Sequence, residues 1–149
     1  MTLQDCRERL YAEGLTCVAA DDAGTVFVSD EKGIKPMLQL LEMCEDKAWK
    51  PKYQADRIIG KAALIISAHC GIEEIYADVA SEGALSLAEE KHIKLTCRER
   101  VSKILNPQKT KEGPFETALA GIDVNDFDRV MEAVRATFEN LKNKDEKRS

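Results

Sequence analysis

Lys61 is the residue of this chain whose type and position best suit chemistry. Asp56 and Gly60 precede it, and an almost wholly apolar segment follows as far as Cys70. An ammonium group about one turn into a buried helix would bind a phosphate or a carboxylate, or would act as a nucleophilic amine. A side chain that reaches back to solvent, or one paired with a carboxylate, explains the lysine equally well. Lys61 is therefore the first candidate for a catalytic or ligand-binding role.

Asp56 and Gly60 each have a structural and a ligand-binding interpretation. Aspartate is a preferred N-cap residue, and from the start of a helix its carboxylate would also reach a ligand. A glycine inside a helix costs about 1 kcal/mol relative to alanine, so Gly60 indicates that a strand or a ligand approaches closely there. A phosphate-binding loop is excluded, because it requires glycine where Ala55 stands and serine or threonine where Ala62 stands.

Four further polar residues are candidates for ligand binding. Ser81 and Glu82 come where a strand is expected to end and a helix to begin, which is where open α/β sheets bind ligands. A serine cap with a glutamate in the first turn explains this pair as well. Asn106 and Glu116 flank a polar loop. This loop would either close over the same ligand-binding position at the strand ends or remain in solvent. A contact between Glu116 and Lys61 would account for both residues.

No metal or other cofactor is expected. His69 and Cys70 are adjacent, but no cluster of further ligands completes a site around them, so a structural role is favoured. The 5 cysteines are an odd number without a C-x-x-C pair, which is typical of reduced thiols and fits neither a zinc knuckle nor a disulfide framework.

Composition describes one ordinary globular domain. The chain has 149 residues, of which 44% are hydrophobic and 33% charged. Its net charge is −5 and its aromatic content 5%. The chain therefore lacks both the basic surface that binds a phosphate backbone and the aromatic residues that stack on bases, and nucleic acid is not expected as a partner. No secretory segment is visible, and the longest apolar run, 62–66, is too short to span a bilayer. We therefore expect a cytoplasmic protein without membrane contact.

Apolar periodicity and turn residues predict the elements that must position these candidates. The predicted elements are a helix at 3–13, a hairpin of strands at 15–20 and 25–29, a helix from Pro36 to residue 44, a loop at 47–54, a buried helix at 56–69, a strand at 74–79, a helix at 82–91 and a strand at 93–97. This alternation predicts an α/β fold with a mixed sheet, in which a parallel portion follows the antiparallel opening hairpin.

The remainder of the chain predicts helices and a polar loop. We expect a short helix at 98–105, a polar loop at 106–113 and a helical turn from Pro114. Apolar residues from Phe127 to Leu141 then lie on one helical stripe, and this helix either docks on the domain or forms a homodimer. The predicted organisation is a domain at 1–122, a C-terminal amphipathic helix at 123–143 packed on it, and a charged tail at 144–149.

Three segments, Ala55–Ala63, Tyr76–Leu85 and Gly113–Glu116, together with this order of elements, resemble the bacterial family known as domain of unknown function 1893. The motifs that carry the resemblance are Asp-x-x-x-Gly-Lys-Ala and Ser-Glu-x-Ala-Leu, and the likeness covers roughly residues 3–122. The resemblance implies a three-layer α-β-α sandwich like that of cytidine deaminases, in a family whose activity is uncharacterised.

The sequence departs from these relatives at two places. The family's late motif usually reads Asn-Arg followed by Cys-Pro-x-Glu, whereas this chain has Asn106-Pro107 and Gly113-Pro114-Phe115-Glu116, so any role of that cysteine is absent. Zinc deaminases also need His-x-Glu or Cys-x-Glu at the start of one helix and Cys-x-x-Cys at the start of the next. Residues 55–66 contain no histidine or cysteine and residues 79–88 no cysteine, so zinc-dependent deamination is not expected.

Three functions remain open from the sequence. The leading hypothesis is a protein that binds a small polar ligand of a nucleoside- or nucleotide-like kind at Asp56, Gly60, Lys61, Ser81, Glu82, Asn106 and Glu116. The second is a metal-free enzyme that uses Lys61 with Glu82 or Glu116 as acid or base. The third is an oligomeric scaffold that associates through its apolar helices.

Overall fold

A mixed five-stranded sheet forms the centre of the molecule. The computed structural model describes residues 1–104 and 113–148 of the chain. The strands, in the spatial order β2-β1-β3-β4-β5, are β1 (Cys17–Ala20), β2 (Val26–Ser29), β3 (Tyr53–Ile59), β4 (Glu74–Ser81) and β5 (Lys94–Val101). The helices are α1 (Leu3–Ala12), α2 (Lys35–Lys47), α3 (Lys61–Cys70), α4 (Glu82–Glu90), α5 (Pro114–Ala118) and α6 (Phe127–Arg148).

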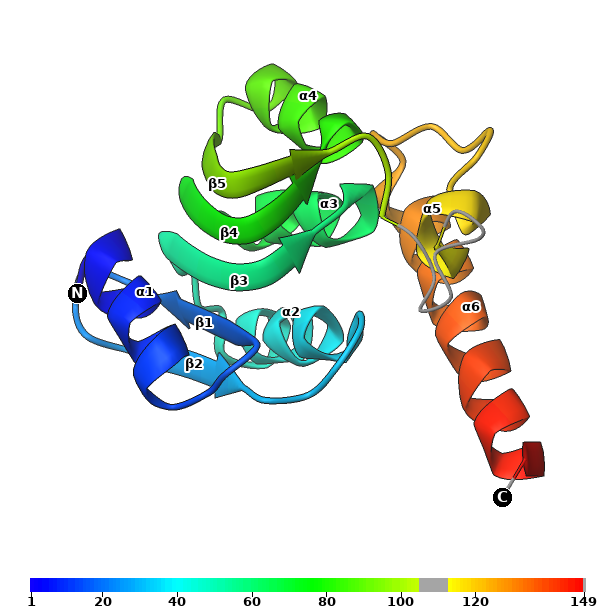
Figure 1. The fold of residues 1–149 in the computed structure, drawn as a ribbon, viewed down its shortest axis with the longest axis horizontal. Helices are drawn as coiled ribbons and strands as arrows, with labels where there is room; N and C mark the ends of the chain where they lie inside the picture. Colours follow the sequence, from blue (N-terminus) through cyan, green and yellow to red (C-terminus); the bar gives the residue numbers. More distant parts are fainter. Residues whose placement is uncertain (105–112, 149) are drawn as a thin grey trace.

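Helices cover both faces of this sheet (Figure 1). On one face, α1 packs on β1, β3 and β4 over a small core that includes Leu10 and Val18. On the other face, α2, α3 and α4 lie side by side over the larger core, in which Leu40, Leu64 and Ile75 are fully buried. The arrangement agrees with the α/β sandwich expected from the sequence.

The strand directions confirm the predicted mixture of pairings. β1 is antiparallel to both β2 and β3, so the opening hairpin continues directly into the rest of the sheet. β3, β4 and β5 are parallel to one another and are joined through α3 and α4. Because parallel strands end at the same edge, the residues after Ile59 and after Ser81 meet at one side of the molecule.

The helix predicted at 56–69 is wrong in its first turn. Tyr53 to Ile59 form β3, which also takes the last residues of the predicted loop at 47–54, and α3 begins only at Lys61. Asp56 is therefore a strand residue, and the N-cap position is occupied by Gly60, whose backbone is extended. The misreading arose because Asp56 is a strong N-cap residue type and because β3, buried on both faces at its start, lacks polar–apolar alternation.

The short helix predicted at 98–105 is also wrong. Residues 94–101 form a single strand, β5, which pairs in parallel with β4 along its whole length. β5 is the outermost strand on its side of the sheet, and most of its side chains are exposed. Charged residues are typical of such edge strands, and in the sequence they resemble a helical surface.

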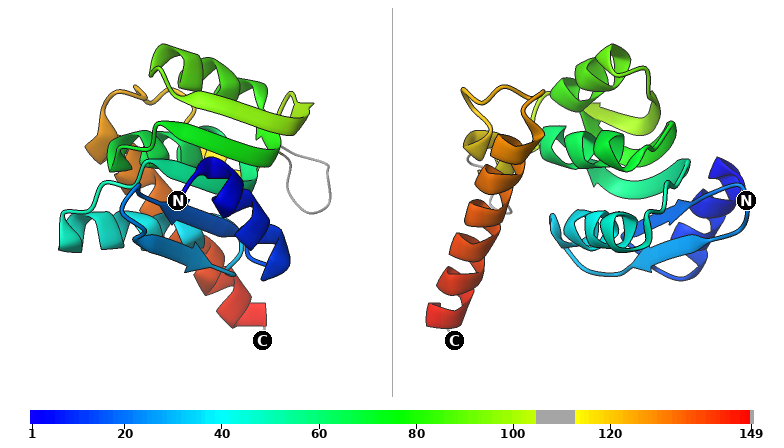
Figure 2. Two further views of the ribbon diagram at one scale, coloured as in Figure 1. Left: turned by 90° about the vertical axis from the view of Figure 1, so that its left-hand side faces the viewer. Right: turned by 180° about the vertical axis from the view of Figure 1, so that it is seen from behind.

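The C-terminal helix α6 docks on its own chain. It packs against α3 and α5, with Val130 and Val134 fully buried, while its C-terminal part extends beyond the sandwich (Figure 2). The ring of Phe127 stacks on His69 of α3, with centroids 3.7 Å apart and an interplanar angle of 5°. The helix runs to Arg148, so the charged tail expected from residue 144 continues it.

None of the helices in the described part of the chain combines the length and the apolar composition that crossing a bilayer requires. All 5 cysteines are free thiols, as the sequence predicts.

Candidate ligand-binding site

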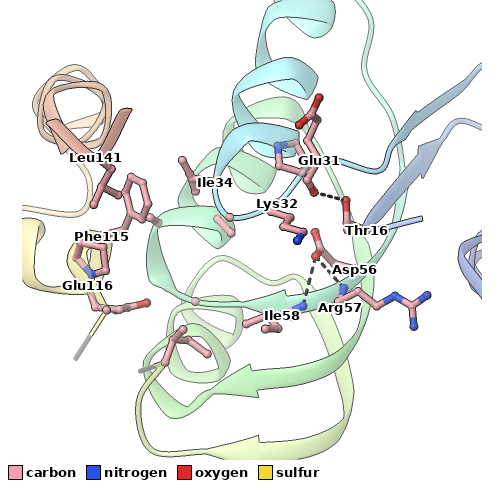
Figure 3. Close-up of a pocket in the computed structure, with 18 residues that line it drawn as sticks. Thr16, Glu31, Lys32, Ile34, Asp56, Arg57, Ile58, Phe115, Glu116 and Leu141 are labelled. Atoms are coloured by element: carbon pink, nitrogen blue, oxygen red, sulfur yellow. Dashed lines mark hydrogen bonds between the residues drawn. The ribbon is translucent and has the colours of Figure 1, made fainter. Parts of the chain in front are cut away.

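A cavity of about 600 Å³ lies at the carboxyl end of β3, between the start of α2, the start of α3, and the helices α5 and α6 (Figure 3). Its walls are mainly apolar, and they bring together residues far apart in the sequence. The apolar side chains of the wall include Ile34, Pro36, Ile58, Phe115 and Leu141. Ile58 is 52% exposed although it lies in a strand, because its side chain forms part of this hollow.

Asp56 is the buried polar group of this pocket. Its side chain is on the lining, yet the residue is only 8% exposed. One carboxylate oxygen, Oδ1, accepts hydrogen bonds from the backbone N–H groups of Arg57 at 2.8 Å and Ile58 at 3.3 Å (Figure 3). The other oxygen, Oδ2, accepts a hydrogen bond from Nε2 of Gln54 at 3.2 Å.

Gln54 belongs to a hydrogen-bonded chain that leads from the pocket into the core. Its Oε1 accepts a hydrogen bond from the hydroxyl of Ser67 on α3 at 2.6 Å, so its amide nitrogen is left to face Asp56. Gln54 and Ser67 are both fully buried. The orientation of the pocket carboxylate is therefore fixed from inside the protein.

Burial raises the pKa of Asp56 to about 7, because removing the charged form from water outweighs the hydrogen bonds that stabilise it. The carboxyl group therefore exists in both protonation states near neutral pH. A pocket with apolar walls and one such group can bind a small organic molecule by its body and recognise a polar group at one end.

Glu116, Gly60 and Lys61 come together, as the sequence suggested, but through the backbone. Oε1 of Glu116 accepts a hydrogen bond from the backbone N–H of Lys61 at 2.8 Å, so the carboxylate caps α3 from α5. A Cβ atom at residue 60 would collide with the same oxygen. The glycine is required by the approach of Glu116, which neither of the two interpretations from sequence had named.

The side chain of Lys61 is exposed, so of the two interpretations from the sequence the buried ammonium group does not apply. Its aliphatic stem lies over Gly83 at the start of α4, where a Cβ would be 2.7 Å from Cε of the lysine. Lys61 does not line the main pocket but, with Glu116, belongs to a second cavity of about 250 Å³ whose other walls come from residues 119–124. The stem thus follows the snorkelling alternative.

The remaining candidates are not part of the main pocket. Ser81 is an N-cap, accepting a hydrogen bond from the backbone N–H of Ala84 at 3.1 Å. Glu82 is exposed and lies 3.9 Å from Arg100. As far as the structure describes the chain, neither residue lines either cavity. Asn106 lies outside the described residues.

The two helix starts do not fit a zinc ion. α3 begins with Gly60-Lys61-Ala62-Ala63 and α4 with Ser81-Glu82-Gly83-Ala84, which together supply one carboxylate and no imidazole or thiolate. Zinc sites in proteins use at least three histidine, cysteine or carboxylate ligands. Within residues 1–104 and 113–148, no group of three such side chains is placed to hold a metal ion.

A second polar cluster, between α1 and the sheet, was missed by the sequence analysis. Asp78 on β4 accepts hydrogen bonds from the hydroxyls of Tyr11 and of Tyr76, the latter at 2.9 Å, and pairs with Nη1 of Arg57 at 3.3 Å. Arg57 thus directs its guanidinium away from the pocket, toward α1 (Figure 3). Although burial raises the pKa of Asp78, these hydrogen bonds keep it below the usual value.

Comparison with known proteins places the chain in a family. A crystal structure of a DUF1893 family protein (TM1506) from Thermotoga maritima is similar, with a TM-score of 0.73 and 22% identity over 93% of this chain and 88% of that one. At this identity the likeness establishes the fold alone. No curated protein matches the chain. The family model of the domain of unknown function DUF1893 (TM1506) matches residues 5–138, and the chain therefore belongs to this family.

Proposed function

We propose that this protein binds a small organic ligand in the pocket at the carboxyl end of β3. The observation that carries the proposal is the combination of a cavity of about 600 Å³ with mainly apolar walls and a carboxyl group that is only 8% exposed. Ligand sites in proteins have this volume and this composition, a hydrophobic lining with few polar groups. The body of the ligand would contact Ile58 and Phe115, and one polar end would meet Asp56.

The chemical class of the ligand rests on two arguments of different strength. The first is the likeness to the fold of cytidine deaminases that the family resemblance implies, which favours a nucleoside-like ligand by analogy alone. It is supported by the layered architecture and by the adjacent starts of α3 and α4 after two parallel strands. The lining itself argues against nucleotides, because Asp56 and Glu116 would face a phosphate with like charge. We therefore expect a nucleoside or another uncharged or cationic ring compound.

A thermal-shift panel of nucleosides, nucleotides, sugar phosphates and simple aromatic compounds tests the proposal. A ligand at 100 times its Kd stabilises the folded state by about 2.7 kcal/mol. Ile58→Arg fills the pocket from an exposed position and should abolish the shift. Val28→Arg, at a strand position that is 39% exposed and does not line the described pocket, is the matched control and should preserve the shift. If no compound stabilises the wild type, or if Ile58→Arg responds like the control, the proposal is wrong.

The two other functions derived from the sequence remain predictions. An enzyme that uses Lys61 would form an imine with a carbonyl substrate, which borohydride would trap in the wild type and not in Lys61→Ala. A homodimer would show a mass that depends on concentration in analytical ultracentrifugation. Because Phe127 and Phe138 both pack within their own chain, a dimer would have to use other residues as well.

A further inference from the structure

The charged groups of the main pocket are predominantly acidic. Glu31, Asp56 and Glu116 all line it. Lys32 also lines it, from an exposed position before α2, while the guanidinium of Arg57 is engaged on the other face of the sheet. Glu31 is paired with Lys35 at 3.4 Å, so its charge is partly compensated outside the pocket. An apolar cavity bordered in this way favours a ligand that carries a positive charge.

Asp56 is well supplied with hydrogen bonds but not with charge. Oδ1 accepts two backbone N–H groups and Oδ2 one side-chain amide, and the thiol of Cys17 is a further, weak donor to this carboxylate. The strong donors thus leave one acceptor site of Oδ2 for a ligand. Among the described residues, no lysine, arginine or histidine nitrogen lies within ion-pairing distance of either oxygen. A buried carboxylate usually has a cationic partner, because an unpaired charge in an apolar site is costly.

We propose that the ligand of this pocket is a small organic cation, with a planar nitrogen group such as an amidinium that pairs with Asp56 and an apolar body that lies against Ile58 and Phe115. This inference rests on the proposed function and specifies its ligand. An N–H group of a planar cation donates a charge-assisted hydrogen bond to a carboxylate oxygen, here Oδ2, and Gln54 already fixes the orientation of this carboxylate. The cation would supply the direct ion pair that no described side chain makes with Asp56.

The groups around Asp56 are compatible with this pairing. Burial raises the pKa of the Cys17 thiol well above its usual value, so that neighbour stays neutral. Lys32 lines the same hollow, and Figure 3 draws its ammonium group next to Asp56, where it would compete with a cationic ligand. The carboxylate of Glu116 is held at the start of α3 and lines the end of the pocket away from Asp56 (Figure 3). Binding of a cation should therefore draw Asp56, whose pKa is about 7, into its ionised form.

Three probes of nearly equal shape test the inference by calorimetry at pH 8: benzamidine, which is cationic, benzamide, which is neutral, and benzoate, which is anionic. The wild type should bind benzamidine at least tenfold more tightly than benzamide and should not bind benzoate measurably. Benzamide binding as tightly as benzamidine, or benzoate binding more tightly, would overturn the inference while leaving the pocket's binding function intact. If neither these probes nor the wider panel binds, the proposed function itself fails.

Two variants and one titration locate the pairing. Asp56→Asn, checked for folding by circular dichroism, should reduce the preference for benzamidine over benzamide to less than twofold, and retention of the preference refutes the assignment. Lys32→Gln leaves the core untouched and should bind benzamidine as tightly or more tightly, whereas a tenfold loss would place the probe on another group. In the wild type, benzamidine affinity should rise about tenfold from pH 6 to pH 8, and a flat profile would contradict pairing with Asp56.

Discussion

Glu116 caps a helix that begins 55 residues before it. Its Oε1 accepts a hydrogen bond from the backbone N–H of Lys61 at 2.8 Å, at the first residue of α3. α3 has no side-chain cap of its own, because Gly60 occupies the N-cap position. A carboxylate at this end of a helix satisfies a free N–H and complements the positive end of the helix dipole. The contact therefore joins α5 to the centre of the domain.

Removal of this cap should destabilise the protein. Glu116→Ala is expected to lower the free energy of unfolding by about 1 kcal/mol, the usual cost of losing a helix cap. Glu116→Gln keeps an acceptor oxygen and should cost less. Urea unfolding measures both, with Glu139→Ala, an exposed change on α6, as the control. Equal stability of the Ala variant and the wild type would show that the contact contributes nothing.

Gly60→Ala should disturb the same contact from the other side. The new Cβ would collide with Oε1 of Glu116, so we expect a loss of about 1 kcal/mol through displacement of the cap. In Glu116→Ala the same change should cost much less, so a double-mutant cycle should find that the double variant loses less stability than the two single changes together. Gly83→Ala is the matched control, because its Cβ meets only the flexible stem of Lys61. Additive effects of the two changes would contradict this account.

Asp56 should make the protein less stable as the pH rises from about 4 to about 7. Its pKa is about 7 when folded and 3.8 in the reference state, so the folded protein holds a proton that the unfolded chain releases in this interval. The stabilisation present at low pH is lost as the pH passes through 7, by up to about 4 kcal/mol. Unfolding of wild type and Asp56→Asn at pH 5 and pH 8 measures the difference, with Asp46→Asn on α2 as the control. A variant with the same pH slope as the wild type would sink the prediction.

Asp78 should have the opposite pH dependence. The hydrogen bonds from Tyr76 and Arg57 stabilise its charged form, so its contribution is present above the unfolded pKa and is lost as the pH falls through the folded value. Asp78→Asn should lower stability by roughly 2 kcal/mol at pH 7, and by less near pH 3. Asp30→Asn, in an exposed loop, should have no effect at either pH. If Asp78→Asn lowers stability as much at pH 3 as at pH 7, the effect of the substitution comes from packing and not from the charge of Asp78.

Local signals were sufficient for part of this fold. The turn between Ala20 and Val26 and the cap at Ser81 depend on neighbouring residues, and both are in the structure as predicted. β3 was not recoverable in this way, since Asp56 is buried by segments distant in the sequence, such as β1, where Cys17 is its partner in the sheet. Its carboxylate binds the backbone of the following residues inside a strand, where the same residue type before a helix would be a cap.

The candidate site was predictable only in its polar part. Asp56, Gly60 and Glu116 were named from the sequence and all line the pocket. The apolar wall was missed, because Phe115 and Leu141 have the pattern of ordinary helix residues and only the placement of α5 and α6 brings them to β3. Ile58 carried the one usable signal, an isoleucine directly after two charged residues.

Because the cap of α3 comes from a distant segment, the amide proton of Lys61 reports on the docking of that segment. The amide proton of Lys61 is bonded to a side chain on α5, while the amides deeper in α3 are bonded within the helix. Its hydrogen exchange should therefore follow the undocking of the C-terminal segment, whereas exchange deeper in α3 follows unfolding of the domain. One backbone position in the middle of the sequence would thus record whether α5, more than 50 residues further along the chain, is in place.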